Sequence, residues 1–494
     1  MLWYGYIYYF LFLIVLFISL IFFFRLLFLT IFNQFNLVSI LSKNILSFFV
    51  FFSFISFLSI YNFLDFFTSF NNIVSTEPLI ISNIDFLPHN YIWNTYNLNL
   101  NLLSIYYFPF IYIFIVITVI SILFCLSYNL NELMGFMFYC TLILIAGLTL
   151  FFTDSIILFF FAYEMLLVPS FFILYNFAKT RRCVEAAYLM FFWTQFGALF
   201  LIFGFLYLFF ICGTSSFSVI SLFYFTPFEL NFLFACFIFG FGVKFPIWPF
   251  YGWLPKAHVE ASTNFSIFLS GVLVKFAFFG LLKCLITLQL EPTFYYIYPF
   301  LFIGIVDAVF KLFYQIDLKK LVAYSTVVEM HWLTICIISG HSPLMLASFA
   351  MLISHALLST NSFLLVDAIG RRFKTRLVTE INGVNFLCPK LFLVSLINLL
   401  VFLGFPGSIM FITEVLFFGF FFDLFPLLCL ILIVLLYLLG PTFFFRTWTN
   451  VLFGSSVFFS KTLPIDLTFK ELLLFGGLLI LMFWLGITWQ AFIF

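Results

Sequence analysis

Four ionisable residues of this sequence lie inside long apolar runs: Glu164, Lys244, Lys275 and Glu414. A charge at membrane depth costs about 2.5–3.5 kcal/mol on insertion scales, so such residues are candidates for function. Burial raises the pKa of a carboxylic acid and lowers that of an ammonium, whereas a nearby opposite charge restores ionisation. An acid and a lysine in a nearly dry site can therefore exchange protons when one of them moves. One such residue could be a static ion pair that fixes helix register, but two lysines and two acids favour a proton relay.

Both lysines flank an interrupted helix in the stretch 239–275. Lys244 is followed by a segment rich in Pro, Trp and Gly, then by a polar elbow at 254–261, then by a second apolar helix that carries Lys275. An open backbone at membrane depth is tolerated only against protein or a wet cavity. A second interruption at 404–407 (Gly-Phe-Pro-Gly) precedes Glu414. We therefore expect two broken helices, each beside a buried ionisable residue.

Three more polar residues are candidates for the same chemistry. His355 lies mid-span, and its unperturbed pKa near neutrality suits a relay, although a hydrogen bond to a neighbouring helix would explain it equally well. His258 lies in the elbow, where a structural capping role is slightly favoured over proton uptake. Glu329 lies about two turns into its helix. Asp307 and Lys311, one turn apart near a helix end, are predicted to form an ion pair.

Composition restricts the class of protein strongly. The 494 residues are 65% hydrophobic and 8% charged, and the mean hydropathy is +1.25. Apolar runs of about 20 residues recur along the chain, which predicts a polytopic helical membrane protein. The net charge of +1 says nothing about nucleic acid, and the sequence has no basic patch interleaved with aromatic residues to suggest that the chain binds it. The 88 phenylalanines are typical of a T-rich organellar genome.

Cofactor motifs are missing from the sequence. The nine cysteines are scattered singly, with no CxxC pair and no Cys/His pair at metal-ligand spacing. Metal, iron–sulfur and disulfide frameworks are therefore not expected. Neither GxGxxG nor a P-loop occurs, so we expect no nucleotide site.

Apolar run lengths predict about 14 spanning helices. The loops after helices 1, 5, 7, 9, 11 and 13 carry almost all Lys and Arg residues, so these loops should share one face, directed to the interior, with both termini outward. The expected spans are 4–24, 44–64, 106–128, 134–153, 155–177, 184–211, 230–253, 262–285, 295–316, 321–340, 343–368, 391–420, 425–446 and 470–493.

The helix layout predicts an internal repeat. Residues 134–285 and 295–446 each hold five helices, and the broken helix, number 7 or 12, is the fourth in each block. An odd number of helices inverts one block relative to the other, and paired interruptions in inverted halves mark transport sites. We expect an all-α polytopic fold with N-terminal helices and a polar loop (1–105), a third helix and linker (106–133), the two blocks, and a C-terminal helix (447–494).

Several motifs carry a resemblance to a known family. LPKAHVEA (254–261) with Lys244 ahead and Lys275 behind, DLKKLVAYST (317–326), FFAYEMLLVP (160–169) and SHALLS (354–359) resemble the antiporter-like membrane subunits of mitochondrial complex I. Among those subunits the elbow motif favours the subunit 4 group. The resemblance implies about 14 helices, two inverted five-helix repeats, and a place in the proton-translocating NADH:ubiquinone reductase (EC 7.1.1.2).

The resemblance also implies roles for the buried residues. Glu164 and Lys244 would form the acid–lysine pair of one half-channel, Lys275 the central relay, His355 the onward connection and Glu414 the residue toward the outer side. Two positions depart from the family pattern: Ser262 stands where proline is usual, and Glu329 where histidine is usual. A carboxylate at Glu329 could still carry protons.

Partners and location follow from the same resemblance. NADH, FMN, iron–sulfur clusters and ubiquinone would belong to partner subunits, with none bound by this chain and no metal; bound lipids such as cardiolipin fit the basic face. Antiporter-like subunits 2 and 5 and accessory subunits would be neighbours, in the mitochondrial inner membrane with basic loops facing the matrix. The alternatives are an Mrp-type cation/proton antiporter subunit, distinguished by sodium dependence, and a structural membrane subunit that does not pump.

Overall fold

The computed structural model of the chain describes residues 130–177, 180–288, 295–340, 342–439, 448–453 and 465–493. The chain divides into two compact units, 1–91 and 92–494, and all described residues belong to the second. The expected spans 4–24, 44–64 and 106–128 lie outside the described residues, so the total of 14 helices stays a prediction. The described regions contain helices and two isolated β-bridges but no strand.

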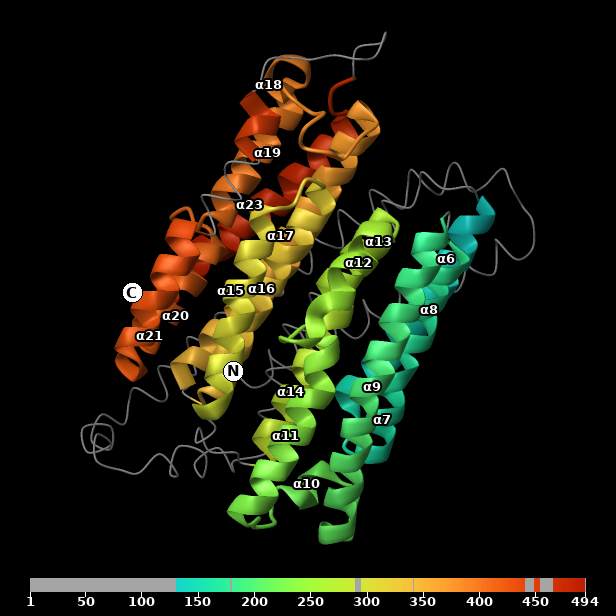
Figure 1. Cartoon of the computed structure of the whole chain (residues 1–494), viewed down its shortest axis with the longest axis vertical. Coiled ribbons are helices and arrows are strands. Elements are labelled where there is room, and N and C mark those ends of the chain that lie inside the picture. Colours follow the sequence, from blue (N-terminus) through green and yellow to red (C-terminus); the bar gives the residue numbers. More distant parts are fainter. Residues whose placement is uncertain are drawn as a thin grey trace, which may run out of the picture. The chain divides into compact units, whose positions relative to one another are not determined.

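The first half of the described region comprises the elements up to residue 287, most of which lie on the right of Figure 1. They are α6 (Leu130–Phe152), α7 (Ile156–Met165), α8 (Leu167–Asn176), α9 (Arg181–Cys212), α10 (Phe217–Ile220), α11 (Pro227–Lys244), the 3₁₀ turn η3 (Phe250–Gly252), α12 (Trp253–Glu260), α13 (Thr263–Phe268), the π-helical turn η4 (Leu269–Leu273) and α14 (Val274–Thr287).

The second half continues with the helices at the centre and left of Figure 1. They are η5 (Tyr295–Ile297), α15 (Tyr298–Phe313), α16 (Leu318–Ile338), α17 (Ser342–Phe373), α18 (Val384–Leu387), α19 (Pro389–Phe402), α20 (Ile409–Leu424), α21 (Pro426–Ile433), the π-helical η6 (Val434–Leu439) and α23 (Phe469–Ile493).

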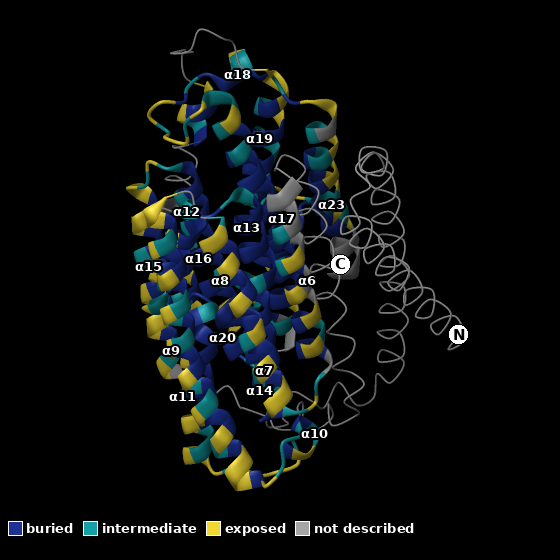
Figure 2. Cartoon of the chain, turned by 90° about the vertical axis from the view of Figure 1, so that its right-hand side faces the viewer, coloured by how far each residue is buried: buried dark blue, intermediate teal, exposed yellow. Residues whose placement is uncertain are grey.

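Six helical segments of the described region are long and apolar enough to cross a membrane: 156–176, 181–212, 227–244, 263–287, 318–338 and 344–373. Nearly every residue of the last three is buried, whereas α9 exposes much of its apolar surface. Figure 2 shows the same contrast between the dark-blue α17 and α13 and the yellow-striped α9 and α11. The chain is a multi-pass helical membrane protein in which 263–287, α16 and α17 form the core.

Helix 5 of the predicted set, 155–177, is two helices in the structure, α7 and α8, which meet at Leu166. Pro169 explains this break, because proline lacks an N–H and its ring clashes with the carbonyl four residues earlier, here that of Met165. The hydropathy pattern does not reveal the break, since apolar residues continue through it.

Both predicted interruptions are confirmed. Predicted helix 7 ends at Lys244, two residues before Pro246, and predicted helix 12 is divided into α19 and α20. Gly404 and Gly407 there adopt φ values of 69° and 92°, a left-handed region that favours glycine. One detail differs from expectation: the polar elbow at 254–261 is largely helical, because it forms α12 with Pro255 in its first turn, where proline is tolerated.

Glycines allow two close helix crossings at these interruptions. A Cβ at Gly197 of α9 would overlap the carbonyl oxygen of Gly240 on α11, one turn before Lys244. A Cβ at Gly486 of α23 would overlap the carbonyl oxygen of Gly407 in the second interruption. Small residues at such contacts let membrane helices approach closely, so α9 and α23 each cover one of the broken helices.

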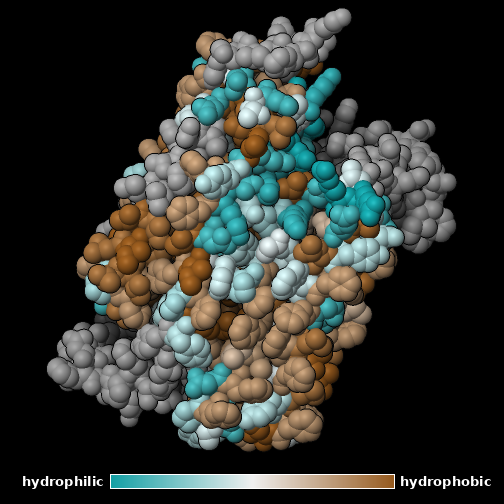
Figure 3. Space-filling view, in the orientation of Figure 1, coloured by the Kyte–Doolittle hydropathy of each residue, from teal (hydrophilic) through white to brown (hydrophobic). Residues whose placement is uncertain are grey.

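The loops after helices 5, 7, 9 and 11 meet at one end of the described bundle. Thr180 donates a hydrogen bond to Glu260, and Lys319 donates to the carbonyl of Ala261. Arg376 donates to the carbonyl of Val259 and lies 3.9 Å from Asp317. Figure 3 shows hydrophilic side chains gathered toward the upper part of this view and apolar ones covering the lower part. The predicted segregation of these four loops is therefore confirmed.

Candidate functional site

The first part of the site is the pair formed by Glu164 and Lys244. Glu164 lies one residue before the end of α7 and Lys244 is the last residue of α11. The lysine Nζ lies 3.7 Å from Glu164 Oε1, with side chains 12% and 21% exposed for Lys244 and Glu164. The pairing expected from the sequence is present.

Two residues that the sequence did not single out complete this pair. Gln195 on α9 donates from Nε2 to Glu164 Oε2 at 2.9 Å. Lys244 Nζ donates to the carbonyl oxygen of Tyr163 at 3.0 Å and lies 3.5 Å from the centre of its ring. Each charge therefore has a neutral partner besides the other charge. The signal available in the sequence was weak, since Gln195 is merely one polar residue within a long apolar helix.

A small cavity opens beside Lys244 toward the helix that carries the second lysine. It has a volume of about 30 Å³ and is lined by residues that include Lys244, Tyr163, Thr194, Leu273 and Val274. A water molecule needs roughly 10–15 Å³ measured this way, together with polar partners. The cavity therefore lies between Lys244 and the helix that carries Lys275, with Val274 and Phe276, the two chain neighbours of Lys275, in its wall.

The second part of the site surrounds Lys275 of α14, which is 5% exposed. Its Nζ lies 2.5 Å from Nδ1 of His355 on α17 and also donates to the carbonyl of Ser270 in the π-helical turn. When Lys275 is an ammonium it can only donate, so that Nδ1 of a neutral His355 accepts and the ring proton sits on Nε2. The imidazole thus receives the lysine on one nitrogen and offers a proton on the other.

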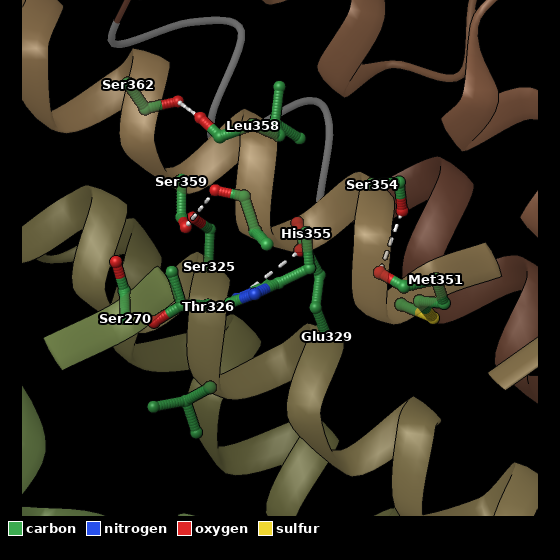
Figure 4. A network of polar contacts seen from close by, with 12 residues as sticks. Ser270, Ser325, Thr326, Glu329, Met351, Ser354, His355, Leu358, Ser359 and Ser362 are labelled. Atoms are coloured by element: carbon green, nitrogen blue, oxygen red, sulfur yellow. Dashed lines mark hydrogen bonds and ion pairs between the residues drawn. The ribbon is translucent and has the colours of Figure 1, made fainter. Parts of the chain in front are cut away.

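Glu329 of α16 occupies the far side of this imidazole. Its Oε2 lies 3.7 Å from His355 Nε2, which is longer than a hydrogen bond, and the two groups form an ion pair only when the imidazole is protonated. Figure 4 shows Glu329 and His355 pointing toward one another from neighbouring helices. Lys275, His355 and Glu329 therefore form one chain of titratable groups, all of them buried.

The serines near His355 do not join this chain. Ser354, Ser359 and Ser362 each donate to a carbonyl of α17 itself, three or four residues back, as Figure 4 shows for two of them. Thr360 likewise donates to the carbonyl of Leu357. In the structure these hydroxyl groups satisfy their own helix.

Glu414 lies at the second interruption, 6% exposed, with its carboxylate against Gly404. Glu414 and Lys275 both lie close enough to Glu329 to interact with it electrostatically. His258 is fully buried, with its ring stacked on Phe363 at a centroid distance of 4.8 Å. Neither of its ring nitrogens has a hydrogen-bond partner within the described region.

Other ionisable residues have structural partners. Asp307 and Lys311 form the predicted ion pair, at 2.7 Å. Lys283 of α14 is buried and donates to the carbonyl of Thr153, with the ring of Phe217 4.8 Å away. Within the described ranges, no group of three or more His, Cys, Asp or Glu side chains could hold a metal ion.

The structure combines two interrupted helices, after α11 and between α19 and α20, with buried lysines and buried acids. These are the features of an ion-translocating membrane subunit. Residues 153–440 match the family described as NADH:quinone oxidoreductase/Mrp antiporter, transmembrane, and the chain belongs to this family. Within it, the chain is similar to NADH-ubiquinone oxidoreductase chain 4 of Paramecium tetraurelia, 36% identical over 339 residues, covering 67% of this chain and 70% of that one. Chain 4 of Marchantia polymorpha is 31% identical over 373 residues, 74% of each. The resemblance found in the sequence is thereby confirmed.

Two solved structures share the fold. A chain of the Mrp complex from Dietzia sp. DQ12-45-1b has a TM-score of 0.68 at 14% identity, covering 78% of this chain and 81% of that one. A chain of the membrane-bound sulfane sulfur reductase, an archaeal respiratory membrane complex, has a TM-score of 0.70 at 17% identity, covering 78% and 79%. At these identities the likeness concerns the fold alone.

Proposed function

We propose that this chain translocates protons as a membrane-arm subunit of NADH:ubiquinone oxidoreductase (EC 7.1.1.2), driven by redox chemistry in other subunits. The observation that carries the proposal is the contact of His355 with Lys275 on one ring nitrogen and its approach to Glu329 on the other. A static ion pair needs no titratable imidazole between its two charges, whereas a relay does.

In this mechanism Glu164 and Lys244 are the first pair. An ammonium that loses its counter-ion in a low dielectric holds its proton less tightly. When the carboxylate withdraws, Lys244 gives up a proton toward the cavity that it shares with Val274. Gln195 holds Glu164 in the paired position and competes with its withdrawal.

Lys275 is the central residue of the proposed relay. It accepts a proton as the neutral amine and passes one to His355 Nδ1, while the ring releases its Nε2 proton to Glu329. Glu414 is the last residue, on the side away from the first pair. One elementary charge moved against about 150 mV costs about 3.5 kcal/mol, from roughly 2.3 per 100 mV. A change of two to three pKa units in one buried group matches that cost, at roughly 1.4 kcal/mol per unit.

The proposal extends to the surroundings of the chain. NADH, FMN, the iron–sulfur clusters and ubiquinone bind to partner subunits, and the antiporter-like subunits 2 and 5 and accessory subunits are its neighbours. The chain lies in the mitochondrial inner membrane, is encoded in the organelle, has its basic loops in the matrix and binds lipids such as cardiolipin. Residues 134–285 and 295–446 are the two inverted repeats. The named relatives support this assembly.

Proton pumping driven by NADH, measured in the assembled complex with Lys244→Ala, tests the proposal. We expect the proton-to-electron ratio to fall while assembly is normal, and Lys244→Arg to separate the need for a charge from the need for a releasable proton. An unchanged ratio in fully assembled complex would contradict the relay and favour a structural subunit.

A second candidate is an Mrp-type cation/proton antiporter subunit, which the fold of the Dietzia chain favours. Proton movement that depends on sodium and not on NADH would support this alternative. Titrating sodium in the same vesicles, with and without NADH, separates the two functions.

A further inference from the structure

The interruption between α11 and α12 leaves backbone N–H groups that need partners. Pro246 and Pro249 have no backbone N–H. The N–H groups of residues 245, 247 and 250 donate to nearby backbone carbonyls. The N–H of Trp248 instead donates to a side chain, Nε2 of His331 on α16, at 2.9 Å. An unsatisfied N–H at membrane depth is costly. The bond to His331 therefore stabilises the non-helical conformation of this segment.

The protonation state of His331 follows from its two partners. A backbone N–H can only donate and a carbonyl can only accept. Because Nε2 faces the N–H of Trp248 and Nδ1 lies 2.8 Å from the carbonyl of Val327, the ring must be neutral with its proton on Nδ1. A second proton on Nε2 would set a donor against a donor and break the bond.

Gly304 of α15 makes room for this contact. A Cβ at this position would overlap Nε2 and Cδ2 of the His331 ring and crowd Cβ of Trp248. Two helices, α15 and α16, thus meet the interruption after α11 at one hydrogen bond, and the histidine that accepts it is fully buried. Such packing is unlike an incidental contact, since any side chain at position 304 would displace the ring that accepts the bond.

A polar cluster beside the bond ties the same segment to α15. Tyr251 of η3 donates to Asp307, and Lys311 donates to the hydroxyl oxygen of Tyr251 at 2.7 Å. The Tyr251 ring also lies edge-on to the His331 ring, at a centroid distance of 6.1 Å. Asp307 of α15 is the charged group of this cluster that acts on His331 electrostatically. Tyr251 contacts the ring from η3, and Glu329 lies two residues before His331 on the same helix.

The contact joins the two parts of the site. Trp248 lies four residues after Lys244, and His331 lies two residues after Glu329. We propose that His331, in its neutral Nδ1–H form, is a positioning residue that fixes the interruption of α11 against α16 and thereby holds Lys244 and Glu329 in register. This inference rests on the proposed relay, but His331 itself does not transfer protons in that relay.

The test compares His331→Gln with His331→Leu in the assembled complex reconstituted in vesicles. Glutamine can accept the Trp248 N–H with its Oε1 but does not titrate, whereas leucine removes the acceptor. We expect the pumping rate at matched NADH oxidation to fall about two- to tenfold in the leucine variant, the range for one hydrogen bond, and to stay within about twofold in the glutamine variant. Thr334→Val, one turn further along α16, is the matched control, because its hydroxyl bonds only to its own helix.

Three outcomes decide the matter. If the glutamine variant falls as far as the leucine variant, His331 carries a proton and the positioning role is overturned. If the leucine variant pumps like the parent, the bond positions nothing. Should the leucine variant fail to assemble, Gly304→Ala repeats the test with His331 in place, and normal pumping there would contradict the inference. Lys244→Ala is measured in parallel: if it alone pumps normally, the relay itself fails, whichever result His331 gives.

Discussion

Lys275 and His355 lie 80 residues apart in the chain, yet Nζ of the first is 2.5 Å from Nδ1 of the second. The π-helical turn η4 ends two residues before Lys275, and its extra residue per turn alters the direction in which the following side chains point. The lysine consequently reaches α17 and the carbonyl of Ser270 at once. In the proposed relay, this contact is the path by which a proton leaves the lysine.

Glu329 is predicted to be essential to the relay. Glu329→Gln keeps the size of the side chain but removes the group that receives the His355 proton, so pumping should fall at least about tenfold, the effect of losing roughly 1.4 kcal/mol. The measurement is the proton-to-electron ratio in vesicles. Glu329→His should restore part of the activity, because imidazole also accepts protons. Glu229→Gln, in the exposed capping box of α11, is the control and should pump normally.

Gln195 should matter through Glu164. Gln195→Leu leaves Glu164 Oε2 without its donor, and a hydrogen bond to a charged group contributes about 1.5–3 kcal/mol. We expect the pumping rate to fall by at least tenfold while the subunit content stays normal. Gln195→Glu should lower the pumping rate further, because it places a second acid beside the first. Pumping equal to the parent in the leucine variant would show that Glu164 does not depend on this contact.

Gly404 and Gly407 offer a matched pair of substitutions. Both have positive φ, so alanine should cost about 1–2 kcal/mol of backbone strain at either position. A Cβ at Gly404 would also strike the carboxylate of Glu414, whereas at Gly407 it would meet no atom within 4 Å. Both variants should lower the melting temperature, but only Gly404→Ala should reduce pumping strongly. Equal pumping in the two would mean that the position of Glu414 is unimportant.

Asn398 and Asn361 should contribute to stability and not to pumping. Asn361 donates to Asn398 Oδ1 at 2.8 Å, and Asn398 donates to the hydroxyl of Ser362, which joins α17 to α19. Asn398→Leu should destabilise by about 0.6–1.7 kcal/mol, the range for hydrogen bonds between membrane helices. Thermal unfolding of the purified complex measures the loss. A double variant with Asn361→Leu should lose less than the sum of the two single changes, since no polar group is left unpaired.

The sequence could predict those features that depend on local chemistry. Proline and glycine mark the interruptions near Pro246 and Gly404, and charge in an apolar run marks Glu164 and Lys244. Pairing across distant helices could not be predicted in the same way. Residues two apart on a helix face different sides, so the spacing of Glu329 and His331 does not join them. The partner of His331 is a backbone N–H 83 residues away, which no local pattern reveals. Tyr251 meets Asp307 only because α15 packs beside η3.

The helical state of α12 was visible in principle. Its residues include Leu, Lys, Ala and Glu, which are good helix formers, and Pro255 falls in the first turn. The polar character of the segment concealed this, because polarity at a membrane boundary resembles a loop. The break at Leu166 was concealed in the opposite way, by apolar residues that continue past Pro169.

The contact of Gly486 with the second interruption has a consequence for the lipid environment. Phe405 and Pro406 of this interruption stay exposed, but where α23 lies against Gly407 and Ser408 the opened backbone faces another helix. The dipoles of those peptide groups are therefore shielded from changes in bilayer thickness or fluidity. Oxidised or shortened lipids should disturb this contact less than they disturb the exposed apolar surface of α9.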